Sequence, residues 1–385
     1  MMGRAECGVA SIRLTFRRGI MHIVPFSKAA PIALAAALSV LSAGTALAAE
    51  SKFAPVGGLG DITASTGNTS APSNWRLDPS ATFNGIANAL DGTAYLEFDG
   101  AWACSGTLIA SQWVLTAAHC APETSMTVYF GLYNNTALEV RTVNVAESVV
   151  HPGWDGTLDT GADIALMKLD APVTGLHIYN LSTTNDVGKE HLITGYGTAG
   201  VGSNTGSPNW NDGAYGHYGY NVFDVTSKVF NDAWDGSGNN TYGETYVVDF
   251  DPLSTITNAS RYNTLQRVAD LTGNQWSSDA GLGANEALIA GGDSGGADFV
   301  WNGTEWLVSG VHSWGWQFCG GRVSPSCDYR SGNSSSYGDI SGSTAVFSHV
   351  DWINSVIDPV PEPGTYALMA MGLFAVGAAA RRRRA

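Results

Sequence analysis

Short β-rich runs alternate with turn residues between about residues 81 and 180. These runs lie at 93–98, 105–110, 112–118, 126–133, 138–150 and 163–169. Evenly spaced short strands of this kind are typical of an all-β barrel or sandwich. This part of the chain is therefore predicted to be an all-β structure.

The following part of the chain is less regular. A strand is predicted at 191–197, and a long stretch at about 199–285 is dense in Gly, Asn, Asp and Tyr, with candidate strands only at 220–225 and 244–251. Beyond it the chain again has strand-like runs, and then one short helix. These lie at 297–301, 305–315, 343–350 and 351–357. No internal repeat of solenoid period is visible.

The N-terminal end is typical of an export signal. A short basic region ends at Lys28, an apolar run follows, and an Ala-Leu-Ala sequence ends at Ala48, where a signal peptidase would cut. We therefore expect residues 1–48 to be a signal peptide, with either an extended basic start or Met21 as the true start. The apolar run is short for a membrane span, which favours removal over an uncleaved membrane helix.

The C-terminal end, residues 360–385, has three parts: a Val-Pro-Glu-Pro-Gly segment, a mostly apolar run and a cluster of four arginines. By the positive-inside rule, a short apolar helix with such a basic stop keeps the arginines in the cytoplasm. The tail resembles the PEP-CTERM sorting signal of exported proteins of Gram-negative bacteria, which implies processing by an exosortase. A plain C-terminal membrane anchor is the alternative, and both place the body of the protein outside the cytoplasm.

Charge separates the ends of the chain from its middle. The whole chain has a net charge of −15, but residues 49–360 alone carry 10 basic and 32 acidic residues, a net charge of −22. A nucleic-acid binder needs a basic patch to neutralise phosphate, so the acidity argues against that class. Residues 49–81, rich in Gly, Ser, Thr, Asn and Pro, are predicted to be a pro-region or linker.

Four cysteines remain in the predicted exported body: Cys104, Cys120, Cys319 and Cys327. An even number fits disulfides in an oxidising compartment, and three pairings are open. No C-x-x-C pair or His cluster suggests zinc, and neither a metal nor a cofactor is predicted.

Three local signatures carry candidate chemistry. A Thr-Ala-Ala-His-Cys sequence places His119 at the end of an apolar strand, Asp163 opens the run 163–169, and Ser294 lies in the glycine-rich run 291–296. A serine hydroxyl needs an adjacent base, histidine has a suitable pKa, and a buried carboxylate fixes the histidine tautomer. Flanking glycines let backbone N–H groups approach a substrate carbonyl as an oxyanion hole.

The chain order His, Asp, Ser is one of those known for this triad, and here the sequence resembles the chymotrypsin/trypsin-like serine protease family (S1-type). TAAHC, DIALMKL and GDSGG match the three catalytic motifs of that family. The resemblance covers about residues 82–357. It implies an all-β fold of two packed six-stranded antiparallel β-barrels, at about 82–180 and 181–357, with a short C-terminal helix.

The resemblance also implies a role for each matching residue. Ser294 would be the nucleophile, His119 the general base and then acid, and Asp163 the orienting carboxylate. The backbone N–H groups of Gly292 and Ser294 would form the oxyanion hole. The family's first disulfide matches Cys104 and Cys120, and Cys319 and Cys327 are expected to pair with each other and close a short loop after Gly315.

The substrate cleft is implied in the same way. The C=O of Ser313 and the N–H and C=O of Gly315 should pair with an extended substrate. Leu288 stands where trypsins carry an aspartate, so preference for Lys or Arg is not supported, and Glu286 could replace that aspartate only on a different loop path. His312 would either bind a substrate carboxylate, as in glutamyl endopeptidases, or pack behind the cleft. The pocket is therefore predicted either to bind an acidic side chain through His312 or to be apolar, with Leu288 and Gly315.

Two departures from the family concern activation and length. The segment between Asp163 and Ser294 is longer than in compact members of the family. The extra residues fall in the stretch 199–285, which could shape the cleft or be a surface insertion. Family members often mature by cutting before a β-branched residue whose ammonium pairs with the aspartate ahead of the serine, here Asp293. Arg76-Leu77 and the region 84–86 are candidate processing sites, and we expect that blocking cleavage at 49–82 lowers activity.

These patterns together predict an exported serine endopeptidase that cuts protein or peptide substrates through an acyl-enzyme, with a P1 preference other than Lys or Arg. Signal peptidase and exosortase are its expected processing partners, contact with the membrane is transient and through the tail, and the product is secreted or associated with the cell surface. Two other classes remain open: a non-catalytic surface or matrix binding protein on the same fold, and an esterase with the same triad.

Overall fold

The computed structural model describes residues 72–98, 102–121, 125–203, 212–236, 241–278, 280–318, 323, 327–329 and 335–358. The chain separates into two units, 1–48 and 49–385, and every described residue belongs to the second. The predicted signal peptide and sorting signal lie outside the described residues, as does the predicted pro-region up to residue 71. In the described ranges, no helix has both the length and the apolar character that a membrane span requires.

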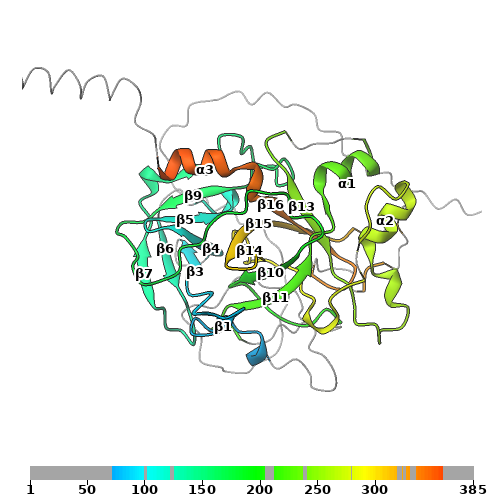
Figure 1. Ribbon diagram of the computed structural model, residues 1–385, viewed down its shortest axis with the longest axis horizontal. Coiled ribbons are helices and arrows are strands. Elements are labelled where there is room, and N and C mark those ends of the chain that lie inside the picture. Colours follow the sequence, from blue (N-terminus) through cyan, green and yellow to red (C-terminus); the bar gives the residue numbers. More distant parts are fainter. Residues whose placement is uncertain are drawn as a thin grey trace, which may run out of the picture. The chain divides into compact units, whose positions relative to one another are not determined.

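The first sheet is antiparallel and contains seven strands in the order β7-β6-β3-β4-β5-β9-β8 (Figure 1). Its strands are β3 (Thr93–Phe98), β4 (Trp102–Ala110), β5 (Trp113–Thr116), β6 (Met126–Phe130), β7 (Glu139–Thr142), β8 (Val149–Val150) and β9 (Ala165–Lys168). Each run predicted between residues 93 and 169 overlaps at least one of them, because short β-branched runs bounded by turn residues leave the backbone few alternatives.

The second sheet is also antiparallel and has the order β11-β10-β14-β15-β16-β13-β12. Its strands are β10 (Glu190–Gly195), β11 (His217–Val222), β12 (Val225–Thr226), β13 (Thr245–Asp249), β14 (Ala297–Trp301), β15 (Trp306–Trp316) and β16 (Ile340–Ala345). A separate hairpin joins β1 (Thr82–Phe83) and β2 (Ile86–Ala87). The predicted all-β class is confirmed, and each sheet has seven strands where six were expected, since the two-residue strands β8 and β12 each extend an edge.

Three α-helices accompany the sheets in the described part of the chain: α1 (Ser227–Trp234), α2 (Thr264–Thr272) and α3 (Val350–Ile357). The 3₁₀ turns are η1 (Pro72–Asn74), η2 (Ala118–Cys120), η3 (Val145–Glu147), η4 (Ala259–Arg261), η5 (Gly283–Asn285) and η6 (Val346–Ser348). The short C-terminal helix was predicted. The other two α-helices lie in the stretch 199–285, for which the sequence predicted only strands and irregular structure.

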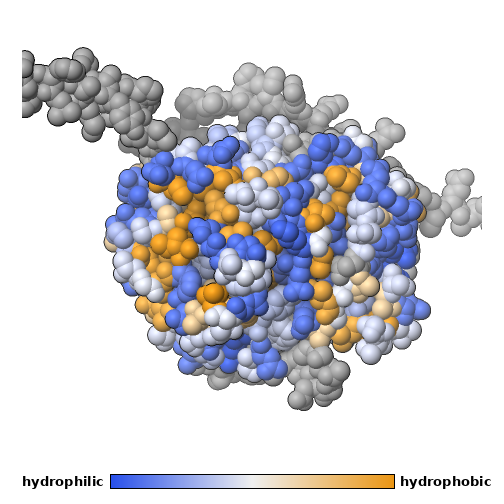
Figure 2. Space-filling model, viewed as in Figure 1, coloured by the Kyte–Doolittle hydropathy of each residue, from blue (hydrophilic) through white to orange (hydrophobic). Residues whose placement is uncertain are grey.

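One hydrophobic core joins the two sheets. Leu96 of β3 and Leu108 of β4 belong to the same buried cluster as Phe299 of β14 and Val308 of β15. On the face shown in Figure 2, exposed hydrophobic residues form several patches divided by hydrophilic ones, which is ordinary for a protein surface. The sheets are therefore held together from inside, and the active-site candidates can be supplied by both.

Candidate active site

His119 and Asp163 come from neighbouring strands of the first sheet. His119 lies in η2 just after β5, and Asp163 precedes β9. β5 and β9 pair antiparallel with Thr116 opposite Ala165, so the end of one strand lies beside the start of the other. Nδ1 of His119 is 2.7 Å from Oδ2 of Asp163, and the backbone N–H of His119 donates to Oδ1 at 2.9 Å.

Asp163 has no exposed side-chain surface, whereas the His119 side chain is 27% exposed. The Ser313 hydroxyl donates to Oδ2 of Asp163 at 2.5 Å, and the Thr344 hydroxyl donates to its backbone oxygen at 3.0 Å. A carboxylate fixed in this way holds the imidazole in one orientation and one tautomer. Proton exchange is then left to Nε2, the ring nitrogen on the opposite side from the carboxylate.

Ser294 follows a glycine-rich turn. Gly291 and Gly292 are the central residues of this turn, in which the N–H of Asp293 donates to the oxygen of Ala290 at 3.2 Å. The φ angle of Gly292 is 101°, which suits a type II turn and strains any residue that has a Cβ. The turn presents Ser294 only partly buried at its end.

The next glycine brings Ser294 against the first sheet. A Cβ on Gly295 would lie 2.0 Å from Oγ1 of Thr116 and 2.5 Å from the oxygen of Ser105, so only glycine fits there. The N–H of Ser105 donates to the oxygen of Ser294 at 2.7 Å, and Sγ of Cys120 lies 3.5 Å from that same oxygen. The serine loop of the second sheet thus packs on the residues that flank His119.

A cavity of about 260 Å³ opens beside Ser294. Two of the predicted substrate-binding residues, Ser313 and Gly315, line it. Its other lining residues are Leu158, Ile289, Ala290, Gly291, Trp314 and Trp316. The rings of Trp314 and Trp316 stack with centroids 4.3 Å apart and form an aromatic wall.

The other two predicted substrate-binding residues, Leu288 and His312, have no exposed surface and lie outside the lining of this cavity. Leu288 packs in a core cluster with Phe223 and Tyr246. Its neighbour Ile289 lines the cavity and also belongs to a buried cluster with Trp75 and Ile193. Sequence reasoning missed Leu158, which comes from a distant loop with no motif, and the Ile289 side chain, whose direction depends on the loop path.

His312 is held within the core by two partners. Its Nε2 is 2.9 Å from Oδ1 of Asp298, and its Nδ1 is 3.2 Å from the oxygen of Asp293. Burial alone would lower the pKa of His312, but the Asp298 carboxylate raises it above its ordinary value. These contacts match the arrangement in which the histidine packs behind the cleft.

Glu286, considered as a substitute for the trypsin aspartate, is 1% exposed. Its two carboxylate oxygens accept hydrogen bonds from the backbone N–H groups of Asp251, at 3.4 Å, and of Leu282, at 2.5 Å. The carboxylate therefore organises neighbouring loops and is not among the residues that line the cavity at Ser294.

Asp293 is fully buried directly before Ser294. Its carboxylate accepts hydrogen bonds from the N–H groups of Gly197 and Ala290, each at 3.1 Å. Burial raises the pKa of Asp293 to about 7, although the charge of nearby His312 acts in the opposite direction.

The segment with the first candidate processing site is part of the folded unit. The Arg76 guanidinium donates to both oxygens of Asp212, at 2.8 and 2.6 Å, and lies 3.6 Å from the ring centroid of Tyr215. Leu77 is 1% exposed, and its N–H donates to the oxygen of Gly216 at 2.9 Å.

A disulfide joins Cys104 and Cys120, as the family resemblance implied. Cys327 is buried and also disulfide-bonded, but Cys319 lies outside the described residues, so their pairing stays a prediction. In the described part of the chain, Cys104, His119 and Cys120 are close enough to form a metal-ligand group. The two sulfurs are already bonded to each other, so this group does not fit a metal ion.

Comparison with known proteins gives two matches along the chain. Residues 87–222 match the trypsin family model, and residues 359–384 match the PEP-CTERM protein-sorting motif. The trypsin match includes His119 and Asp163 and ends before Ser294. This part of the chain is therefore similar to the trypsin family of serine proteases, and the C-terminal motif indicates export from the cytoplasm in Gram-negative bacteria.

The curated relatives agree with this family. Trypsin of Sus scrofa is 38% identical over 105 residues, which is 26% of this chain and 44% of the trypsin. Chymotrypsin-like elastase family member 1 of Canis lupus familiaris is 42% identical over 82 residues, 20% of this chain and 31% of the elastase. The chain thus spans less than half the length of these relatives. Among solved structures, the mouse brain serine protease neuropsin matches with a TM-score of 0.45 and 19% identity, over 70% of this chain and 96% of neuropsin.

Proposed function

We propose that this protein is an exported serine endopeptidase with Ser294 as nucleophile, His119 as general base and then acid, and Asp163 as the carboxylate that orients it. The observation that carries the proposal is the 2.7 Å contact between His119 and the fully buried Asp163, in a site where the loop of Ser294 packs on the residues flanking the histidine. The product is secreted or attached to the cell surface after an exosortase has processed its tail.

The reaction follows from the roles of these groups. Nε2 of His119 takes the proton from the Ser294 hydroxyl while the serine oxygen attacks the scissile carbonyl carbon. The imidazolium then gives that proton to the leaving amine, which leaves an acyl-enzyme. Water, activated by the same nitrogen, hydrolyses the ester and restores the serine.

The backbone supplies the other half of the catalysis. The N–H groups of Gly292 and Ser294 stabilise the oxyanion, and the type II turn presets the backbone at Gly292. Losing one such donor costs on the order of 100-fold or more in rate. An extended substrate adds as a strand to the carbonyl of Ser313 and to the N–H and C=O of Gly315.

The proposed P1 preference is apolar. Leu158 and Ile289 contribute aliphatic surface to the cavity beside Ser294, Trp314 contributes an aromatic face, and the described residues of its lining include no acidic side chain. A lysine or arginine would lose its hydration there without gaining a partner. Glu286 and His312 are buried outside the lining of this cavity. The shape and size of the P1 side chain are instead limited by the 260 Å³ of space beside Ser294.

Covalent labelling tests the catalytic proposal. An active-site phosphonate fluoride should label the purified protein and should not label the Ser294→Ala variant, because the adduct forms on the activated hydroxyl. Ser111→Ala, which changes an exposed serine in the turn between β4 and β5, is the matched control and should keep its labelling because the serine loop is unchanged. Absence of Ser294-dependent labelling would support a non-catalytic binding protein on this fold.

A peptide-library digest separates protease from esterase and reports the P1 side chain. We expect cleavage after apolar residues and little after Lys or Arg. Hydrolysis of ester substrates without any peptide cleavage would overturn the peptidase assignment. Preferred cleavage after Lys or Arg would overturn the apolar pocket and leave the triad untouched.

A further inference from the structure

A second and larger cavity, of about 640 Å³, lies at the opposite end of the second sheet from Ser294. β14 begins three residues after Ser294 and ends at Trp301, and β15 begins at Trp306 and ends in the substrate cleft. Since a strand rises about 3.3 Å per residue, the two cavities lie more than about 10 Å apart along these strands. This second cavity is separate from the proposed catalytic site.

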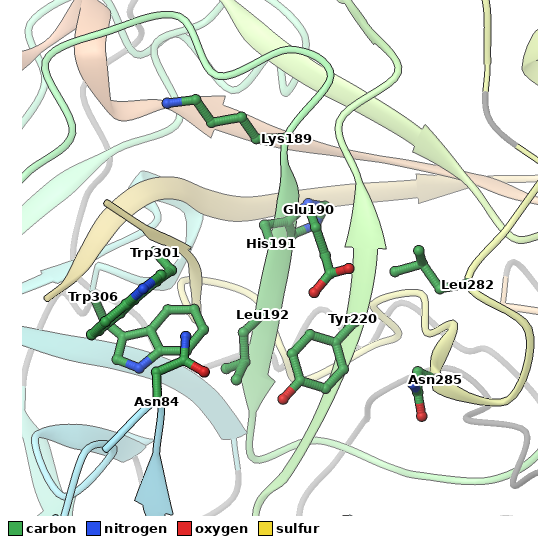
Figure 3. A pocket seen from close by; sticks show the side chains of 10 residues that line it. All are labelled: Asn84, Lys189, Glu190, His191, Leu192, Tyr220, Leu282, Asn285, Trp301 and Trp306. Atoms are coloured by element: carbon green, nitrogen blue, oxygen red, sulfur yellow. The ribbon is translucent and has the colours of Figure 1, made fainter. Parts of the chain in front are cut away.

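Aromatic rings form one side of this cavity. Figure 3 shows Trp301 and Trp306 next to each other on one side, with the ring of Tyr220 facing the space from β11. The two indole rings have centroids 5.3 Å apart. Indole faces attract cations through their quadrupole, more strongly than the faces of other aromatic side chains.

The charge that faces the cavity is negative. In Figure 3 the Glu190 carboxylate points toward the ring of Tyr220, whereas the ammonium of Lys189 extends away and donates to Asp186 at 2.7 Å. Burial lowers the pKa of His191 to about 4, so this ring is neutral at pH 7. Burial and the nearby Glu190 charge raise the pKa of Tyr220 to about 12, so the phenol is neutral too.

We propose that this cavity binds an organic cation, specifically a primary alkylammonium group. The ammonium would lie against the indole faces of Trp301 and Trp306 and donate to the Glu190 carboxylate. The net charge of −15 favours approach of such a ligand over an anion. The ammonium can come from a lysine side chain in a peptide or from a free polyamine, because both offer the same primary ammonium to the indole faces and the carboxylate.

Calorimetric titration of the full exported chain carrying Ser294→Ala tests this proposal without substrate turnover. The probes are an acetylated and amidated Ala-Lys-Ala peptide, its norleucine counterpart, and free 1,5-diaminopentane. The lysyl peptide should bind and the norleucine peptide should not, because the two differ in the ammonium group. Binding should weaken as salt is added, since part of the attraction is Coulombic.

Variants locate the binding. Glu190→Gln should weaken binding of the lysyl peptide about 10-fold, and Trp301→Leu about fivefold. Glu147→Gln, which removes an exposed carboxylate beside the first sheet, should leave the affinity unchanged. Thermal unfolding of each variant shows whether it is folded, and Glu190 is exposed enough for its substitution to leave the fold intact.

Each outcome decides the matter. Binding of the lysyl peptide and of the diamine, both reduced by Glu190→Gln, supports a general alkylammonium site. Binding of the lysyl peptide alone supports a peptide ligand. Equal binding of the norleucine peptide, no effect of Glu190→Gln, or no binding of either cation overturns the proposal.

Discussion

At the scale of single residues, the hydrogen bonds of Asp163 make it the most informative position to change. It accepts from the Ser313 hydroxyl and the backbone N–H of His119 and lies 2.7 Å from Nδ1 of that histidine. Asp163→Asn keeps the shape of the side chain but offers an N–H₂ group to the imidazole, which favours the wrong tautomer. We expect kcat to fall on the order of 10⁴-fold with little change in KM, measured with an apolar-P1 fluorogenic peptide.

Ser313→Ala is the matched control for that variant. It removes one donor to Asp163 and leaves the carboxylate–imidazole pair in place, so its loss of kcat should be far smaller. If Asp163→Asn retained activity near that of the unchanged protein, the assignment of the triad would be wrong.

His349 gives a stability prediction whose sign can be worked out. The residue is 2% exposed, its ring lies 4.9 Å from that of His151, and burial lowers its pKa from 6.5 to about 4. Between these two values the unfolded chain takes up a proton that the folded protein does not, so stability falls as the pH falls. At pH 5 the cost is about 2 kcal/mol.

The variant His349→Asn cannot take up this proton. Urea unfolding at pH 7 and pH 5 should therefore show that the variant loses about 2 kcal/mol less than the unchanged protein between the two pH values. Comparing the stability lost between pH 7 and pH 5 in the two proteins cancels the contributions of histidines that do not contact His349 and any loss of packing that is the same at both pH values. Parallel losses in the two proteins would contradict the prediction.

At the scale of elements, the disulfide between Cys104 of β4 and Cys120 of η2 connects the strand that contacts the Ser294 loop with the turn that carries His119. Its sequence separation is 16 residues. Closing a loop of this length stabilises a fold by about 3 kcal/mol, so the Cys104→Ala, Cys120→Ala double variant should lose about that much unfolding free energy in urea. Unchanged stability would mean that packing alone fixes this turn.

The elements also show how far the sequence can predict this fold. The strands of the first sheet and the pair formed by His119 and Asp163 were predictable, because each depends on a local run or motif. α2 was missed although its ends carry local signals: the side chain of Asn263 accepts the N–H of Gln266, and Gly273 takes the left-handed conformation after the last turn. These signals were hidden in a stretch where Gly and Asn are frequent throughout.

The direction of side chains around the cavities was not predictable from local patterns. Leu288 and Ile289 are adjacent, apolar and buried in two different clusters, yet only the second also lines the cavity at Ser294. Which of them faces the substrate depends on where the loops and the second sheet meet. A sequence position relative to a motif therefore does not decide which of two neighbouring apolar side chains lines a cavity.

At the scale of the whole molecule, the segment ahead of the first sheet is bound to the edge of the second. Trp75 packs against Tyr218 with ring centroids 5.5 Å apart, and Arg76 forms its ion pair with Asp212. A protease that cuts between Arg76 and Leu77 needs an extended and accessible strand of substrate, and both residues are held in this structure. We therefore expect the mature chain to begin ahead of Trp75, as determined by N-terminal sequencing and intact mass of the exported protein.

Arg76→Ala is the matched variant for this expectation. Removing the guanidinium leaves the buried carboxylate of Asp212 with His217 as its other partner, 3.0 Å away, and frees the segment from the ring of Tyr215. The variant should unfold at lower urea concentration, by about 2 kcal/mol, and its segment at 72–77 should become sensitive to added proteases of apolar specificity. A mature N-terminus at Leu77 in the unchanged protein would mean that processing occurs before this segment folds onto the sheet.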